Sequence, residues 1–435
     1  MFCQLELLRQ CFPPSVRHIL EELPDSLDET YERILKEIRK PNQGHAHRLL
    51  QCLVVAVRPL RIEELAEVLA FDFQTGGMPK LNPGWRWEDQ EEAVTSACSS
   101  FVAIIKDGDS RVVQFSHFSV KEFLTANRLA DPVRDVSRYH IRLDAAHTIL
   151  AQACLGVLLR LDERVDRDSI KSFPLAGYAA QYWPTHARVG DASSQIKDGM
   201  DRLFDADKPH FATWLWVYGD DWAARSMPTE RPEEPRAVPL YYAARFGFRD
   251  LAERLIAEHP EHVNVNSIKT TMGNPMHVAV YEDHAKVLSL LIEHGADIEC
   301  LNEGGSGFTP LNLASCYGRL EIGQCLLDRG ADIETRDAWG CTPLINAVRQ
   351  GRVEFARMLL EHGAVIDAQD NYGRTALHFA AEYGSTQAMQ LLLKRGADVN
   401  VLNHFGDNPS ELASSNGHQE VVELIAAYGA ESVNK

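Results

Sequence analysis

Hydrophobic and polar positions recur with a fixed period from about residue 238 to the end of the chain. The dipeptide Gly-Ala returns at intervals of 35, 33, 33 and 33 residues, and a helix-start signal lies upstream of each copy at the same intervals. Two independent markers that share one period indicate a repeat array. The Gly-Ala pairs begin at Gly295, Gly330, Gly363, Gly396 and Gly429, and the start signals are Asn274-Pro275, Thr309-Pro310, Thr342-Pro343, Thr375-Ala376 and Asn408-Pro409.

Each period predicts two short helices and an extended loop. Thr342 is an N-cap that accepts a backbone N–H, and Pro343 tolerates the first helical position. Gly351 then ends the first helix in a left-handed turn, and the second helix buries Leu359-Leu360. One such unit cannot bury its own apolar face, so neighbouring units must stack. With an earlier copy at Val238-Pro239, we expect a solenoid of about six repeats over residues 238–435.

This pattern resembles the ankyrin repeat, whose signature is nearly complete in Thr375-Ala376-Leu377-His378. The resemblance covers about 200 residues and implies binding of another protein through the finger loops and the inner helices. The last copy carries polar residues such as Ser414 and Asn416 on its first helix, as a capping repeat requires.

Three predicted finger tips carry an aromatic residue at one register, each before a glycine. These are Trp339, Tyr372 and Phe405, which lie 33 residues apart and should form a row. Exposed aromatic rings beside polar groups are typical anchors for a partner, and packing of each ring on the next finger is the alternative. The predicted protein-binding set adds Asp337, Asp370, Asn371 and Asn403 beside the rings, and Tyr383 and Arg349 on the inner helices.

The first half shows helical periodicity that is interrupted by one hairpin. Leu27, Tyr31, Ile34 and Leu35 share a helix face behind an N-cap at Ser26. Further helices are predicted over about 45–57, 62–70 and 87–99, followed by strands over 101–105 and 112–115 and a helix from about Ser119. Three helices followed by a hairpin is the order of a winged helix. Residues 136–225 are predicted to be helical.

Several segments resemble the region that follows the NTPase domain in fungal NACHT–ankyrin proteins, which are signal-transducing NTPases of the NOD-like type. They are Leu23 to Leu35, Arg58 to Ala66, Phe115 to Leu124 and Ala179 to Ala187. The resemblance implies a winged helix that packs on a nucleotide domain and helps to hold a resting state. We expect a helical segment that follows a missing NTPase domain (1–45), a winged-helix-like domain (46–135) and a helical domain (136–227). A proline-rich linker (228–237) and the ankyrin repeats (238–435) complete the chain as given.

The nucleotide chemistry of that family is not evident in this sequence. A P-loop needs Gly-x-x-x-x-Gly-Lys-Ser/Thr, and the dipeptide Gly-Lys does not occur. We expect a chain that starts just after the NTPase domain, which leaves a truncated gene model, a fragment and a stand-alone regulator open. In related NTPases a winged-helix histidine contacts the ADP phosphate. The resemblance makes His117 a weak candidate for that contact, and capping of the following helix is the alternative.

Charge and composition narrow the class of partner. The net charge is −18, and acidic residues exceed basic ones in both halves, so a phosphate backbone would be repelled. The predicted third helix region also carries Glu88, Asp89, Glu91 and Glu92, which excludes a DNA-reading role. We expect no nucleic acid and no membrane partner, because the longest apolar run is far too short to span a bilayer. The nine cysteines form no Cys-x-x-Cys pair, which predicts reduced thiols in a cytoplasmic protein, with the nucleus as a second compartment.

No catalytic constellation is present. The sequence lacks His-Glu-x-x-His, Gly-x-Ser-x-Gly and a zinc-type cysteine pattern, and His259 and His262 flank a proline in an irregular finger. We therefore predict a mainly α protein, not an enzyme, with no cofactor and no metal. Its expected role is an interaction module for another protein in a NACHT-type system. The alternative is the regulatory half of a nucleotide-dependent switch that needs a P-loop domain in cis or in trans.

Overall fold

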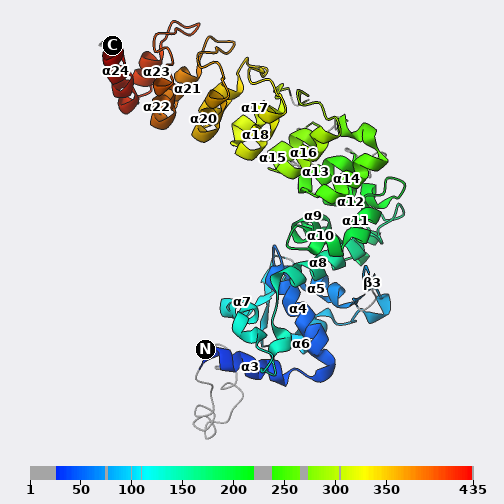
Figure 1. Cartoon of the computed structure of the whole chain (residues 1–435). Helices are drawn as coiled ribbons and strands as arrows, with labels where there is room; N and C mark the ends of the chain where they lie inside the picture. The colour runs from blue at the N-terminus through cyan, green and yellow to red at the C-terminus, as the bar shows by residue number, and fades with distance from the viewer. Residues whose placement is uncertain are drawn as a thin grey trace. The chain divides into compact units, whose positions relative to one another are not determined.

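The structure is a computed structural model that describes residues 26–73, 77–98, 100–108, 110–219, 238–264, 273–302 and 305–433. The chain divides into two compact units, Met1–Pro235 and Arg236–Lys435 (Figure 1). The predicted proline-rich linker at 228–237 lies outside the described residues. No helix in the described ranges is long and apolar enough to cross a bilayer.

The first unit begins with a set of helices that follow the predicted apolar faces. Helix α3 (Leu27–Glu37) starts at Ser26, whose Oγ accepts the N–H of Glu29 at 3.2 Å. Helices α4 (Gln43–Val55), α5 (Ile62–Leu69) and α6 (Gln90–Cys98) agree with the three predicted helices within a few residues. Tyr31 and Leu35 of α3 are buried, as their shared helix face predicts.

A small antiparallel sheet follows the helices. Strands β4 (Val102–Asp107) and β5 (Ser110–Phe115) form the predicted hairpin, with Ile105 opposite Val112. Strand β1 (Leu60–Arg61) pairs with the other edge of β5 and places Leu60 opposite Val113, so the strand order is β1-β5-β4. The sequence pattern did not predict β1. Helix α7 (Phe118–Thr125) completes the winged-helix order, and a separate short pair joins β2 (Phe71–Asp72) to β3 (Lys80–Leu81).

From residue 136 to 219, where its described residues end, the first unit is helical, as predicted. It contains α8 (Leu143–Leu158), α9 (Ala176–Ala187), α10 (Ala192–Gln195), α11 (Lys197–Leu203) and α12 (His210–Tyr218), and α8 packs against both α9 and α4. Trp183, Phe204 and Trp214 form the core, with ring centroids 5.5–6.1 Å apart. Short 3₁₀ helices occupy Lys40–Asn42, Pro83–Trp85, Asn127–Ala130, Ser137–Tyr139, Ser169–Ser172 and, in the second unit, Pro260–Asn264.

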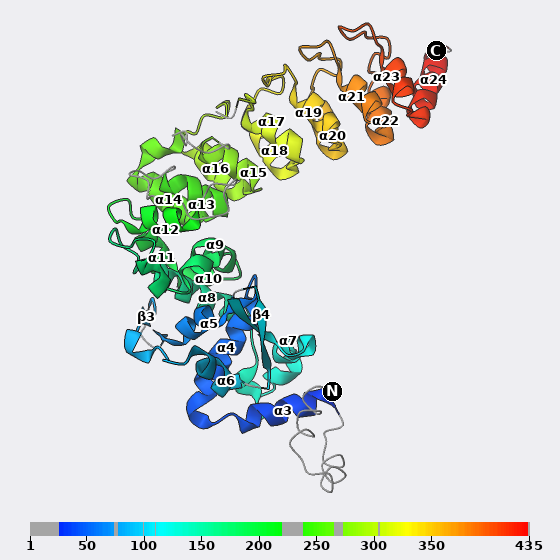
Figure 2. The same cartoon turned by 180° about the vertical axis from the view of Figure 1, so that it is seen from behind.

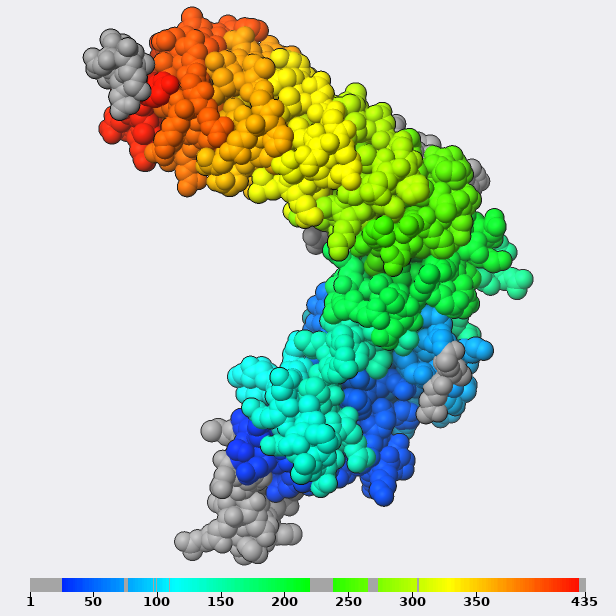
Figure 3. Space-filling view, viewed as in Figure 1, coloured from blue at the N-terminus to red at the C-terminus, as the bar shows by residue number. Residues whose placement is uncertain are grey.

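The second unit stacks six helix pairs across its described residues (Figure 2). In the space-filling view, successive repeats lie against one another as contiguous bands from green to red (Figure 3). The helix pairs are α13 (Pro239–Phe246) with α14 (Arg249–Glu258), α15 (Pro275–Tyr281) with α16 (Ala285–Glu293), α17 (Pro310–Tyr317) with α18 (Leu320–Asp328), α19 (Pro343–Arg349) with α20 (Val353–Glu361), α21 (Ala376–Glu382) with α22 (Thr386–Lys394), and α23 (Pro409–Ser415) with α24 (Gln419–Val433).

The inner helices start as the sequence predicts. Thr309 and Thr342 accept the N–H of Asn312 and of Ile345 at 3.3 and 3.4 Å, with proline at the first helical position. Thr375 instead forms a capping box with His378, whose Nδ1 accepts the N–H of Thr375 at 3.1 Å. Each start satisfies backbone donors that would otherwise lack a partner in the helix.

Candidate protein-binding surface

Each finger tip is a turn built by one acidic or amide side chain. In the finger before α19, Asp337 Oδ1 accepts the N–H groups of Trp339 and Cys341, both at 2.9 Å, and its Oδ2 accepts Asn346 Nδ2 at 2.9 Å. Gly340 completes the turn with φ 76°, a left-handed value that glycine adopts without strain. The carboxylate is therefore committed to the fold of its own finger.

The next two fingers repeat this geometry. Asp370 Oδ1 accepts the N–H groups of Tyr372 and Arg374 at 2.8 Å, and its Oδ2 pairs with the Arg374 guanidinium at 2.9 Å. Asn403 Oδ1 accepts the N–H groups of Phe405 and Asp407 at 2.9 Å. Asp337, Asp370 and Asn403 are only 5–6% exposed, so the structure places these predicted contact residues inside the turns.

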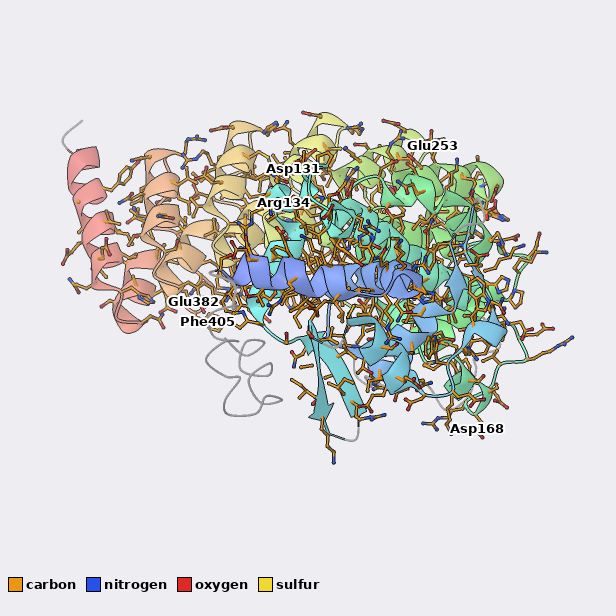
Figure 4. The ribbon with its side chains drawn as sticks, turned by 90° about the horizontal axis from the view of Figure 1, so that it is seen from below. Asp131, Arg134, Asp168, Glu253, Glu382 and Phe405 are labelled. Atoms are coloured by element: carbon orange, nitrogen blue, oxygen red, sulfur yellow. The ribbon has the colours of Figure 1, made fainter. Side chains whose placement is uncertain are left out.

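The aromatic side chains of the same turns point outward. Trp339 is 42% exposed, Tyr372 46% and Phe405 73%, and Phe405 is labelled in Figure 4. The rings also touch neighbours: Tyr372 and Phe405 stack at 6.4 Å between centroids, and Phe308 lies 6.0 Å from Trp339. The three predicted rings and Phe308 therefore form two pairs. Packing accounts for one face of each ring and leaves the rest accessible to a partner.

Backbone hydrogen bonds join the fingers to one another. The N–H of Ala338 donates to Ser306 O at 3.0 Å, that of Asn371 to Trp339 O at 3.0 Å, and that of His404 to Tyr372 O at 2.9 Å. These bonds recur at the same register in three successive fingers. Asn371 is exposed and adds a bond from its Nδ2 to Ala338 O at 3.3 Å. These hydrogen bonds between fingers fix the spacing of the rings. Loops without such bonds would not hold the rings at a fixed spacing.

Two arginines lie over the aromatic rings. The Arg349 guanidinium stands 5.9 Å from the centroid of Trp339, and that of Arg374 stands 5.2 Å from Tyr372 and 4.3 Å from Phe379. Arg349 extends from the end of α19 toward the finger, so a predicted inner-helix residue and a predicted tip residue belong to one surface. A cation over a ring face is favourable and also presents charge to a ligand.

The C-terminal ends of the inner helices carry a second set of exposed aromatic side chains. Tyr383 is 57% exposed and Tyr317 39%, and Tyr317 meets Tyr281 edge to face at 5.0 Å. Tyr383 follows the last residue of α21, at the same end of its inner helix as Arg349 in α19. Within the described residues, no ring contact or cation contact joins Tyr383 to the finger-tip rings.

His117 caps a helix in the first unit. Its Nδ1 accepts the N–H of Ser119 at 3.3 Å at the start of α7 and lies 2.6 Å from Ser119 Oγ. Tyr31 reaches the same hydroxyl at 2.8 Å. The imidazole thus has a structural role within the described residues, which is the alternative that the sequence left open for it.

A buried chain of hydrogen bonds also lies in the first unit, and no sequence pattern indicates it. Tyr178 Oη accepts the N–H of Val57 at 3.1 Å and lies 2.9 Å from His186 Nε2, while His186 Nδ1 lies 2.9 Å from His147 Nδ1. The Tyr178 hydroxyl can donate to Nε2 of His186 while its oxygen accepts the N–H of Val57. Burial, together with the neighbouring His147, lowers the pKa of His186 to about 3.

Two further groups of polar side chains lie outside this surface. His259 Nδ1 and His262 Nε2 lie 3.3 and 3.9 Å from Glu261 Oε1 after α14, so the structure brings together a histidine pair for which the sequence predicted no site. The second group lines a cleft of about 710 Å³ in the first unit. There Arg58 is held by Glu64 at 2.6 Å, and Lys171 is held by Asp168 at 2.7 Å. Neither group shows a nucleophile paired with a base.

Comparison with known proteins agrees with the two-part fold. Residues 240–337, 330–403 and 367–435 match the family model for ankyrin repeats, and residues 31–133 match that for the winged-helix domain of GPI inositol-deacylase. The azaphilone pigments biosynthesis cluster protein L of Monascus ruber is 32% identical over 294 residues, 64% of this chain. The ankyrin repeat and SAM domain-containing protein 6 of Mus musculus is 32% identical over 113 residues, and the ankyrin repeat protein nuc-2 of Neurospora crassa 30% over 122 residues.

These relatives are longer than the matched region. The chain covers 61% of the Monascus protein, 12% of the mouse protein and 11% of the Neurospora protein. In the latter two, the match is 25% and 27% of this chain. The second unit is therefore an array of ankyrin repeats, and the first unit contains a winged-helix domain of the GPI inositol-deacylase type.

Proposed function

We propose that the chain is a non-enzymatic interaction module whose ankyrin array binds another protein through the finger tips. The main support is that, within each finger, one residue forms the turn and another presents a ring to solvent. Asp337, Asp370 and Asn403 form the turns, while Trp339, Tyr372 and Phe405 project from them partly exposed. Rings of this kind, ordered by their own backbone and still accessible, are typical hot spots of protein interfaces.

The cations over the rings give this surface a polar component. Arg349 over Trp339 and Arg374 over Tyr372 hold charge beside each aromatic face. Arg374 is neutralised by Asp370, so it supports the ring rather than offering a free charge. Arg349 is half-buried and is the group of this pair better placed to meet a carboxylate of the partner.

We further propose that this module acts in a NACHT-type signalling protein in the cytoplasm. The support is the sequence resemblance over Leu23 to Leu35, Arg58 to Ala66 and Phe115 to Leu124, together with the order of a winged helix followed by ankyrin repeats. In that setting the array would recognise a protein, and the first unit would transmit the result. A role for His117 in contacting nucleotide receives no support from its geometry as a helix cap.

The test is the simultaneous replacement of Trp339, Tyr372 and Phe405 by alanine. A partner is first captured with the wild-type chain and identified, and its affinity is then measured by biolayer interferometry. We expect a loss of about 100-fold or more, because hot-spot rings contribute about 2 kcal/mol or more each and are not additive. Leu320→Ala, an exposed apolar residue at the start of α18, is the matched control and should bind normally.

Thermal unfolding separates binding from packing. If the triple variant keeps its transition temperature and loses affinity, the rings are contact residues. If it keeps full affinity, the finger-tip proposal fails. A lower transition temperature with a proportionate loss of affinity would show that the rings serve the stacking of the fingers.

A further inference from the structure

The turn between the two helices of each repeat has one register position in the left-handed region. It is occupied by glycine in five repeats and by Asp283 in the second, with φ between 66° and 77°. The residue that follows lies directly before the second helix. These positions are Gly247, Asp283, Gly318, Gly351, Gly384 and Gly417, followed by Phe248, His284, Arg319, Arg352, Ser385 and His418.

At four of the five joints, this following residue ties its repeat to the preceding one. Its side chain donates to a carbonyl at the end of the preceding inner helix, always at the same register. The bonds are His284 Nε2 to Arg245 O at 3.1 Å, Arg319 Nη2 to Tyr281 O at 2.8 Å, Arg352 Nε to Cys316 O at 3.1 Å, and His418 Nε2 to Glu382 O at 3.1 Å.

The fifth joint lacks this tie. Its residue is Ser385, whose Oγ accepts the N–H of Ala388 at 3.4 Å and so caps its own helix α22. The carbonyl at the equivalent register belongs to Arg349. Among the residues that the structure describes, no side chain donates to this carbonyl oxygen.

The space for the missing side chain is also present. A Cβ added at Gly247, Gly318 or Gly384 would lie 2.5–3.0 Å from the tying His284, Arg352 or His418. A Cβ added at Gly351 meets nothing within 4 Å, and Gly351 is exposed, whereas those three glycines are half-buried. We call the set of Arg349 O, Gly351 and Ser385 the open joint.

We propose that the open joint binds an arginine side chain of the protein partner. The neighbouring joints supply the reason, because two of them fill the equivalent place with a guanidinium of this chain. The carbonyl at the end of α19 also lies at the negative end of the helix dipole, which favours a cation. Arginine presents several N–H donors in a plane and stays charged, so it suits this acceptor better than lysine or histidine.

Two further observations favour a basic ligand. Tyr383, two residues before Ser385, is 57% exposed and offers a ring face to a cation at this end of the repeat. The chain carries a net charge of −18, which attracts a basic segment. This inference rests on the proposed function and adds to it the chemistry of one side chain that the partner would supply.

The probe is N-acetyl-arginine methylamide, titrated into the full ¹⁵N-labelled chain and followed by amide chemical shifts. We expect saturable shifts in the millimolar range at Gly351 and Ser385. N-acetyl-citrulline methylamide has nearly the same shape without the charge and should shift these amides at least several-fold less. Equal shifts with both probes, or none with either, would overturn the proposal.

Two variants sharpen the result. Ser385→Arg supplies the missing tie from within the chain and should abolish the shifts at Gly351. Arg352→Ser creates a second open joint at Gly318 and should add saturable shifts there. Binding that survives Ser385→Arg refutes the site.

The aromatic triple-alanine variant should bind the probe as the wild-type chain does. Failure of the finger-tip proposal therefore leaves this result standing, and the two ideas can fail separately.

Discussion

The two units achieve stability in different ways. In the array each contact is made several times at one register, so the tie at the end of an inner helix can be compared across five joints. In the first unit each contact occurs once, as in the chain from Val57 through Tyr178 and His186 to His147. Ser385, which does not make the tie, can therefore be compared with the equivalent residues of the other repeats. His186 has no equivalent in the first unit and must be interpreted from its own contacts.

The largest expected effect on stability comes from truncating a core side chain of one unit, which should leave the other unit unaffected. Trp183 is fully buried against Phe204 and Trp214 in the first unit. Trp183→Ala should lower the free energy of unfolding of that unit by about 3–5 kcal/mol, from lost burial and the cavity left behind. In calorimetry one of two transitions should shift. The matched variant Trp339→Ala, at a half-exposed tryptophan of the array, should change stability by no more than about 1 kcal/mol.

If both transitions moved together in Trp183→Ala, the two units would unfold as one cooperative body. The two units would then differ in the pattern of their contacts but would not differ in how they unfold.

A smaller effect is expected from the buried histidine of the first unit. The pKa of His186 is lowered to about 3 by burial, whereas its unfolded value is about 6.5. The unfolded state therefore binds more protons below pH 6.5, and stability falls as the pH falls from there toward 3. Between pH 7 and pH 5 the loss from this group is about 2 kcal/mol.

Urea unfolding at several pH values tests this expectation. His186→Asn removes the titrating group and should flatten the pH dependence of the first unit by that amount, whatever its effect on stability at pH 7. Leu320→Ala, which removes no ionisable group, should leave the pH dependence unchanged. An unaltered slope in His186→Asn would show that other groups carry the acid sensitivity.

The smallest effect concerns the one repeat that departs from glycine at the left-handed position. Asp283 has φ 66° and pairs with Arg319 at 3.2 Å. Asp283→Gly relieves about 1–2 kcal/mol of backbone strain and loses an exposed ion pair worth about 0.2–1 kcal/mol. We expect a net gain of about 0.5–1 kcal/mol in the unfolding free energy of the array. Asp283→Ala keeps the strain and loses the ion pair, so it should be destabilising, and a stabilised alanine variant would contradict this account.

Much of the fold could be predicted because its signals are local or periodic. The capping threonines and Gly-Ala pairs located the repeats, and the predicted strands over 101–105 and 112–115 located the hairpin. Strand β1 could not be predicted, because two residues show no alternation and their pairing with β5 is set by the folded sheet. Similarly, the contact between Tyr178 and Val57 joins residues far apart in sequence, and no pattern indicates it.

The candidate surface was predicted in part. The register of Trp339, Tyr372 and Phe405 indicated exposed rings, which the structure shows. The acidic neighbours were expected at the surface, yet Asp337 and Asp370 are buried because each carboxylate accepts the amides two and four residues later. An acidic residue three positions before a glycine is a signal for such a turn. Aligning the repeats at the residue after each turn glycine would also have shown Ser385 as the exception.

The finger turns have a consequence for how such an array changes over generations. The residues that set the backbone of a finger, Asp370 and Gly373 for example, differ from the residue whose ring faces outward, Tyr372. A substitution at the ring position therefore alters what one finger contacts and leaves the loop conformation intact. Successive fingers can diversify one at a time, so a new specificity can arise by stepwise exchange on an unchanged scaffold.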